Sequence, residues 1–333
     1  MSKKLENLKK MTFKDVMINY GVIIIMVALI IFTGITKPNF LTSNNITNVL
    51  TTMSYRIVIA LGIAGCIITG GCDLSAGRMI GFGACIAGTL LQKADYSGKF
   101  FPNMGTWNIF AALLVTMLIC AVFGAITGFF IAYLNVPPFI STMAMMEIVW
   151  GINSIYTNAT PLGGYASSYT HLATGKFLGL SYLIWIALLV IAITWFIFNM
   201  TRHGKYMYAI GGNPQAAEVA GVPVKKTLVI IYAKAAAMYG LAGFMMGARS
   251  GGASTSTGLS YEMEAIAACT IGGVSVSGGR GKVSSAIIGV AVFEFLKTAL
   301  QFLGVTPFAQ YIALGIIIYV AISLDIRKYV AKK

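Results

Sequence analysis

The sequence predicts an all-α polytopic membrane protein with about ten transmembrane helices. Hydrophobic residues make up 57% of the 333-residue chain, whereas charged residues make up only 10%. Several uncharged runs approach the length of about 20 residues that an α-helix needs to cross a bilayer. Glycine is abundant, with 37 residues, which is typical of helices that pack closely in lipid. The lipid bilayer is therefore the first expected partner of this chain.

The apolar runs divide the chain in order. A basic segment occupies 1–19, a transmembrane domain follows over 20–325, and a basic tail occupies 326–333. Within the transmembrane domain we expect spans at 20–36, 55–72, 78–93, 108–134, 139–157, 179–200, 227–248, 261–275, 283–303 and 308–325. The second, third and eighth spans are short and interrupted by glycine, which weakens the signal for their boundaries.

The distribution of positive charge predicts the orientation of the spans. If the N-terminus is cytoplasmic, 16 of the 24 lysine and arginine residues fall in inside segments, Arg78 and Arg280 among them. Arg56 and Arg249 then fall outside. Because cytoplasmic loops are enriched in positive charge, this bias predicts that both termini are cytoplasmic. It also explains the net charge of +14, so we expect no nucleic-acid partner.

A short polar segment between the sixth and seventh predicted spans has the signals of a complete helix. Asn213 is a good N-cap, Pro214 suits the first helical position, and Gly221 suits the position after the C-cap. The predicted helix, 214–220, is about 10 Å long. A helix this short is unstable alone in water, so it must pack against another surface. That surface is either a partner protein or the chain's own neighbouring segments.

Two glycine-rich stretches are similar in sequence. Residues 70–78 read GGCDLSAGR and residues 272–280 read GGVSVSGGR, with five of nine positions identical at a constant offset of 202. The offset also places the first span on the seventh, which predicts two similarly oriented repeats. Paired glycines interrupt helices and expose backbone polar groups, which in a bilayer must be buried in protein or face water.

Carboxylates occur in or beside the predicted spans. They are Glu147, Glu262, Glu264 and Glu294. A charge in the membrane is costly, so each should face the bundle interior, pair with a cation or be protonated. Lys297 follows Glu294 by one helical turn and is its predicted partner. Glu147 is predicted to hydrogen-bond a polar neighbour such as Asn153, and a proton-coupled role is the alternative.

The segment AIGGNPQAAEVAGV, 209–222, resembles the cytoplasmic coupling segment of sugar permeases in the ribose/galactose branch of ABC importers. Four more stretches resemble the same family and are collinear with it over nearly the whole chain: TGGCDLSAGR, YLNVPPFISTMAMMEIVWGINSIY, YEMEAIAACTIGGVSVSGGRG and LDIRKYVAKK. The motifs DLSAGR and GINSIY and the run YEMEAIAAC are most similar to the galactose/methyl-galactoside permeases of this family.

This resemblance implies a transport subunit rather than an enzyme, located in the bacterial cytoplasmic (inner) membrane. It implies ATP-driven import of a monosaccharide, with galactose or a methyl galactoside as the substrate. The implied partners are a second permease copy, a cytoplasmic ATPase that carries ATP and Mg²⁺, and a periplasmic or extracellular sugar-binding protein. The chain itself is expected to bind no cofactor. The coupling segment is placed at 202–226, and its expected ATPase contacts are Asn213, Pro214, Ala216, Ala217, Glu218 and Gly221.

The resemblance also makes the interrupted helices candidates for the sugar path. The candidate residues are Gly70, Gly71, Asp73, Ser75, Arg78, Glu147, Asn153, Gly272, Gly273, Ser277 and Arg280. Asp73 and Ser75 can bond sugar hydroxyls; alternatively, the motif is a tight helix crossing in which Asp73 pairs with Arg78 or Arg280. Aromatic side chains near span ends suit either sugar stacking or the membrane interface. They are Trp150, Tyr156 and Tyr261.

Other functions remain as alternatives or are disfavoured. The alternatives are an ion-coupled secondary sugar transporter that uses Glu147, an ABC permease for ribose or another pentose or hexose, and a membrane scaffold or receptor. The run GGRGKVSS does not fit a P-loop, because Val283 stands where serine or threonine is needed. No catalytic arrangement is recognised, and no His, Cys or carboxylate cluster has the spacing of a metal site.

Overall fold

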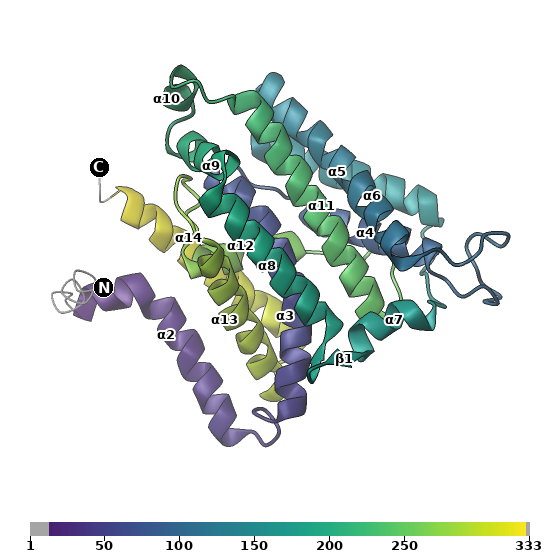
Figure 1. Ribbon diagram of the computed structural model, residues 1–333. Helices are drawn as coiled ribbons and strands as arrows, with labels where there is room; N and C mark the ends of the chain where they lie inside the picture. The colour runs from purple at the N-terminus through teal and green to yellow at the C-terminus, as the bar shows by residue number, and fades with distance from the viewer. Residues whose placement is uncertain (1–12, 331–333) are drawn as a thin grey trace.

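The computed structural model describes residues 13–330, which are almost entirely helical, as predicted (Figure 1). The helices are α2 (Phe13–Thr36), α3 (Ser43–Ile68), α4 (Ala76–Leu90), α5 (Ile109–Tyr133), α6 (Pro138–Thr157), α7 (Ser167–Thr174), α8 (Tyr182–Met200), α9 (Arg202–Gly212), α10 (Pro214–Val219), α11 (Val224–Ser250), α12 (Tyr261–Gly272), α13 (Val283–Phe302) and α14 (Pro307–Val330). A small antiparallel hairpin pairs β1 (Lys176–Phe177) with β2 (Leu180–Ser181). Most of the predicted basic N-terminal segment and the end of the basic tail lie outside the described residues.

The membrane-spanning character of the chain is evident in the long helices. Over residues 24–320, where the side chains are described, five helices are long and apolar enough to cross a bilayer by length and composition: α3, α5, α8, α11 and α13. The other five predicted spans overlap with α2, α4, α6, α12 and α14. The polytopic α-helical class is therefore confirmed, whereas the number of ten spans stays a prediction.

The predicted start of the second span lies twelve residues after the actual start of α3. We expected it at 55–72, but α3 begins at Ser43, and the Thr42 hydroxyl caps it by accepting a hydrogen bond from the Asn45 backbone. The most apolar 18-residue window of α3 is 94% buried inside the fold. A helix surrounded by protein tolerates polar side chains that a lipid-facing helix does not. Arg56, which was predicted to lie outside, belongs to α3, and its side chain is buried among the surrounding helices.

The core lies where α3, α4 and α11 pack together, and its largest fully buried side chains include Tyr232, Tyr239 and Phe244 of α11. Close approach of α4 and α11 depends on glycine. A Cβ atom at Gly243 would collide with the Ile80 carbonyl oxygen, so the two backbones would separate if a side chain were introduced. Small residues at such crossings are the usual means of helix association in membranes.

The outer helices leave an apolar surface for lipid. On α5 the side chains of Phe110, Leu114, Leu118 and Val122 are exposed at helical spacing, and α8 exposes Leu189, Ile193 and Phe196. Figure 1 shows the long helices running roughly alongside one another, with α10 at one end of the bundle and α7 and the hairpin towards the opposite end. This arrangement separates the predicted coupling segment from the connection between α6 and α8.

Candidate functional site

The short helix α10 is capped at both ends by the residues that the sequence indicates. Asn213 accepts a hydrogen bond from the Ala216 backbone N–H through its side-chain oxygen at 2.9 Å. At the other end, Gly221 has a positive φ of 82°. The Gly221 N–H donates to Glu218 and the Val222 N–H donates to Ala217, each at 3.0 Å. These two bonds form a Schellman motif, which explains why the helix stops after two turns.

Helix α10 protrudes from the bundle and is largely uncovered (Figure 1). Of its apolar side chains, Ala217 is buried against the chain, whereas Val219 is 92% exposed and Ala216 is also exposed. Asn213, Pro214, Glu218 and Gly221 are exposed as well. The neighbouring segments therefore cover only one side of the helix and leave a small apolar surface for another molecule.

Helix α9, which was not predicted as a separate element, anchors α10 to the bundle. The Thr201 hydroxyl caps α9 by accepting from the Gly204 N–H at 3.2 Å. The Tyr208 hydroxyl donates to the Gly281 carbonyl at 2.8 Å. Gly211 lies so close to Ile68 and Gly279 that a Cβ atom there would collide with both backbones. The coupling segment thus touches the regions that hold both glycine-rich motifs.

The structure brings the two glycine-rich motifs together. The Gly279 N–H donates to the Ile68 carbonyl at 2.8 Å, and a Cβ atom built on Gly278 would lie 3.1 Å from the Gly70 Cα atom. The φ angles of Gly70 and Gly278 are 81° and 82°, a conformation that glycine adopts without strain. Each motif separates two helices, and most of its residues are buried or half-buried, whereas Gly70 and Gly273 are exposed.

The remaining predicted residues of the two motifs differ in exposure. Gly71 packs against the Tyr232 hydroxyl, and Gly272 packs against the Ser285 backbone of α13. Gly273 ends α12 with a φ of 101°. Ser277 is half-buried, whereas the Arg280 side chain is exposed. The Arg280 backbone closes the loop between α12 and α13, because its carbonyl accepts a hydrogen bond from the Ser275 N–H at 3.0 Å.

The expected ion pair of Asp73 is wrong. One Asp73 carboxylate oxygen accepts from the Ser75 backbone N–H at 3.0 Å and from the Ser75 hydroxyl at 2.6 Å. Asp73 is almost completely buried, and within residues 13–330 it forms no ion pair with Arg78 or Arg280. The carboxylate instead caps the turn before α4, because two local donors reach it without moving a long side chain.

Arg78 lies beside the middle of α6 and the connection between α11 and α12. Its guanidinium carbon is 4.9 Å from the centre of the Trp150 ring, and its Nη1 donates to the Thr255 carbonyl at 3.1 Å. Trp150 is twelve residues after Pro138, which corresponds to about 18 Å along the helix. The prediction that Arg78 lies inside rested on its position at the first residue of the predicted span 78–93.

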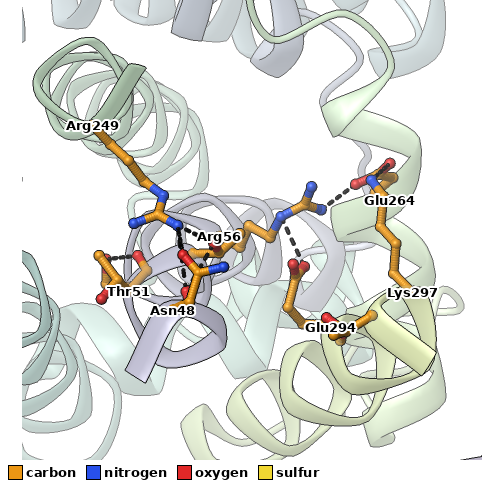
Figure 2. Close-up of polar contacts among 10 residues, drawn as sticks. Asn48, Thr51, Arg56, Arg249, Glu264, Glu294 and Lys297 are labelled. Atoms are coloured by element: carbon orange, nitrogen blue, oxygen red, sulfur yellow. Dashed lines mark hydrogen bonds and ion pairs between the residues drawn. The ribbon is translucent and has the colours of Figure 1, made fainter. Parts of the chain in front are cut away.

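Four charged side chains form a network within the fold, of which three are buried and the fourth, Lys297, is half-buried (Figure 2). Arg56 of α3 pairs with Glu264 of α12, and its Nε lies 2.9 Å from a carboxylate oxygen of Glu294 of α13. Lys297 donates to the second oxygen of Glu264 at 2.8 Å. The predicted pair of Lys297 with Glu294 is therefore wrong. Arg56 compensates Glu294 instead, and Lys297 connects α13 with α12.

Further polar contacts extend from this network. The Arg56 guanidinium carbon lies 4.6 Å from the centre of the Tyr261 ring. On another side of α3, Arg249 of α11 donates to Asn48 (Figure 2). Arg249 also donates to the Thr52 hydroxyl at 3.0 Å. Sequence reasoning missed the role of Arg56, although a lone arginine beside an apolar run is a signal for a buried partner.

Glu147 does not face the bundle interior, which was one of the three arrangements predicted for the carboxylates in or near the spans. Its side chain is exposed on α6, and among residues 13–330 it makes no hydrogen bond to Asn153. Asn153 is 2% exposed, and its side-chain oxygen is buried without a hydrogen-bond partner. The two residues are six positions apart, so they point to different sides of the helix.

In the described part of the chain, no group of His, Cys, Asp and Glu residues is arranged to hold a metal ion.

Comparisons with known proteins extend over almost the whole chain. Residues 45–322 match the family described as branched-chain amino acid transport system / permease component. The chain is 46% identical over 321 residues to the galactose/methyl galactoside import permease protein of Escherichia coli K12, which covers 94% of this chain and 95% of that protein. The protein of the same name from Haemophilus influenzae is 43% identical, with the same coverage.

The ribose import permease protein of Escherichia coli K12 is also similar. It is 32% identical over 310 residues, which is 92% of this chain and 93% of that protein. No solved structure matches the fold. The glycine-rich and coupling segments that suggested a sugar permease lie within the matched residues. The chain is therefore a multi-pass membrane transport protein, and it belongs to the family described as branched-chain amino acid transport system / permease component.

Proposed function

We propose that this chain is the membrane-spanning permease subunit of an ATP-driven importer, and that galactose or a methyl galactoside is its substrate. The observation that carries the proposal is the similarity over 94% of the chain to the import permease proteins for these sugars. The ribose import permease proteins are less similar, which ranks ribose below galactose as the substrate.

The exposed helix α10 supports the proposed coupling to a partner ATPase. A two-turn helix with Val219 uncovered suits a cleft in another protein better than contact with water. In the proposed mechanism, ATP closes the ATPase, which pushes on α10 and α9. The Tyr208–Gly281 hydrogen bond and the contact of Gly211 with Ile68 then carry the movement to the glycine-rich motifs.

The proposed assembly contains a second permease copy, a cytoplasmic ATPase with ATP and Mg²⁺ bound to it, and a periplasmic or extracellular sugar-binding protein. The membrane domain occupies 20–325 and the cytoplasmic coupling segment occupies 202–226. The end segments, 1–19 and 326–333, lie in the cytoplasm, and the complex lies in the bacterial cytoplasmic (inner) membrane. The permease moves the sugar without a covalent step, because hydrolysis belongs to the ATPase.

Reconstitution tests this function. Proteoliposomes would contain the permease with its co-purified ATPase, and radiolabelled galactose would be supplied with the binding protein. We expect galactose uptake to require ATP, to persist when a protonophore collapses the proton gradient, and to be reduced less by excess ribose than by excess unlabelled galactose. Uptake without ATP, or uptake that the protonophore abolishes, would instead indicate an ion-coupled transporter.

A second experiment tests the coupling segment itself. Deletion of 214–220 should abolish uptake and the association with the ATPase, while the permease still inserts in the membrane. Gly221→Leu should have the same direction of effect, because leucine strains at the φ of 82° that ends α10. Normal uptake by the deletion variant would contradict the proposed coupling.

A further inference from the structure

The exposed face of α6 carries a charged residue at mid-depth. Glu147 lies nine residues after Pro138, about 14 Å along a helix of about 30 Å. Its side chain is exposed, and among the residues that the structure describes no cation pairs with it. A carboxylate that faces lipid at this depth is costly, whereas one that faces a water-filled path is not. The Glu147 side of α6 therefore suits a path better than lipid.

The stacked pair of Arg78 and Trp150 lies next to this carboxylate. Trp150 follows Glu147 by one helical turn, and 43% of its surface remains exposed beside the Arg78 guanidinium. Arg78 uses Nη1 for the Thr255 carbonyl. Among the residues whose side chains the structure describes, none accepts a hydrogen bond from its other side-chain N–H groups, although the Arg78 side chain is half-buried. These donors can bond water or a ligand oxygen, while the charge of Arg78 also interacts with the nearby Glu262 carboxylate.

A hydroxyl-rich segment, 254–257, borders the same pair. The Ser254 and Ser256 hydroxyls lie 2.9 Å apart, and Ser256 is exposed. The segment packs on α4, where a Cβ atom at Gly81 would collide with the Thr257 carbonyl. Aromatic, cationic, anionic and hydroxyl groups thus come together from α4, α6 and the connection between α11 and α12.

These groups match the chemistry of a monosaccharide. An indole ring packs on the C–H face of a sugar ring, a guanidinium donates two parallel hydrogen bonds to adjacent hydroxyl oxygens, and a carboxylate accepts from another hydroxyl. An anionic ligand would meet Glu147 beside the arginine, so a neutral polyol is the better fit. Transport sites near the bilayer midplane at interrupted helices have this general placement.

We propose that Arg78, Trp150 and Glu147 form a monosaccharide-contact site halfway along the transport path, bordered by 254–257. This inference rests on the proposed function. It assigns to the permease a sugar contact of its own, in addition to the recognition by the binding protein. Because sugar must also leave the site, the contact is weak and its loss affects transport more than ATP hydrolysis.

Thiol accessibility tests which side of α6 faces water. Glu147→Cys and Ile148→Cys are matched, because both positions are exposed and adjacent but point about 100° apart. Cys72 would be replaced by alanine, since the other four cysteines are buried. In the assembled importer we expect a charged methanethiosulfonate reagent to label Glu147→Cys about tenfold faster than Ile148→Cys, because charged reagents avoid lipid. Equal labelling rates would overturn the proposal.

Transport measurements test the sugar contact. We expect Trp150→Ala and Arg78→Lys to lower galactose uptake about tenfold, since stacking and the guanidinium fork are lost. ATP hydrolysis stimulated by the loaded binding protein should persist, and Trp150→Phe should recover most uptake. Ile155→Ala is the control, because Ile155 is 81% exposed on the same helix but outside the site. Its uptake should equal that of the wild type.

The outcomes separate this site from the proposed function. A wild-type complex that imports galactose with ATP, together with normal uptake by Trp150→Ala and Arg78→Lys, would overturn the contact site alone. A wild-type complex that imports no sugar would contradict the proposed function and the site with it. Loss of both uptake and stimulated hydrolysis in Trp150→Phe would also overturn the site, because it would indicate a structural role for the ring.

Discussion

Arg56 of α3 and Glu264 of α12 lie 208 positions apart in the sequence and form a buried ion pair. Glu294 and Lys297 of α13 complete the network around them. Two cations and two carboxylates thus compensate one another inside an apolar bundle. The network ties α3, which precedes the first glycine-rich motif, to the two helices on either side of the second motif.

Glu264→Gln should destabilise the fold. The substitution leaves Arg56 with only Glu294 and leaves Lys297 without its partner, and breaking a buried pair costs about 3–5 kcal/mol. Denaturant unfolding in detergent micelles would measure the free energy of unfolding. Asp95→Asn removes a carboxylate from an exposed loop and is the control, with an expected change within about 0.5 kcal/mol. Equal effects of the two substitutions would show that the network does not stabilise the fold.

Gly211→Ala should disturb the contact between the coupling segment and the glycine-rich motifs. A Cβ atom at Gly211 collides with the Ile68 carbonyl and the Gly279 nitrogen, whereas one at Gly212 meets nothing within 4 Å. We therefore expect Gly211→Ala to lower both the melting temperature and ATP-driven uptake. Gly212→Ala, its neighbour in the same helix, should leave both near the wild-type values. Wild-type uptake by Gly211→Ala would indicate that this contact does not carry the coupling movement.

Asn213→Ala should weaken α10 without altering the membrane bundle. Loss of the N-cap costs about 1 kcal/mol in helix stability, and the exposed two-turn helix has few other contacts that compensate. We expect less ATPase to co-purify with this permease and the melting temperature of the isolated permease to change little. Asn213→Asp keeps the acceptor and should behave as the wild type, and Gln215→Ala is the control at an exposed, non-capping position. Co-purification unaffected by Asn213→Ala would argue against α10 as the docking element.

Acid should destabilise the fold partly through His203 of α9. This side chain lines an apolar cavity of about 240 Å³ with Lys234. Burial and the nearby Lys234 ammonium lower the pKa of His203 to about 4, whereas an unfolded histidine has a pKa of about 6.5. Between these values the unfolded state binds the proton and the folded state does not. The contribution of His203 to the free energy of unfolding is therefore fully present above a pH of about 6.5. This contribution is lost as the pH falls towards about 4.

Melting temperatures at several pH values would measure this effect. His203→Gln should show a smaller decrease in melting temperature between neutral and mildly acidic buffer than the wild type. His171→Gln removes the exposed histidine of α7 and controls for the general loss of an imidazole. Identical pH profiles for wild type and His203→Gln would contradict the proposed contribution of His203.

Features with local causes could be predicted from the sequence. The caps of α10 depend on Asn213 and Gly221 and on the backbone groups within a few residues of them, so both are evident from the residue order. The ends of α5, α6 and α13 lie within one or two residues of the predicted spans. Each of these spans has a long apolar run with polar or glycine-rich residues at its limits.

Features that depend on neighbouring helices could not be predicted in this way. The sequence indicated that Lys297 pairs with Glu294 because they are one turn apart, but Glu264 of another helix is the actual partner. It indicated that Asp73 pairs with an arginine, but Ser75 satisfies it locally. The start of α3 was misplaced because its polar residues are accommodated by surrounding protein.

The sequence by itself determined the membrane class, the ends of several helices and the resemblance to sugar permeases. Hydrophobicity and helix capping depend on residues that are close together in the chain. Only the tertiary structure decided which charges pair, that the motifs around Gly70 and Gly278 touch, and that Glu147 and Trp150 share an exposed face with Arg78. Ion pairing and exposure depend on which helices are adjacent. In a low-dielectric interior, a partner from a distant helix can outweigh one that is a single turn away.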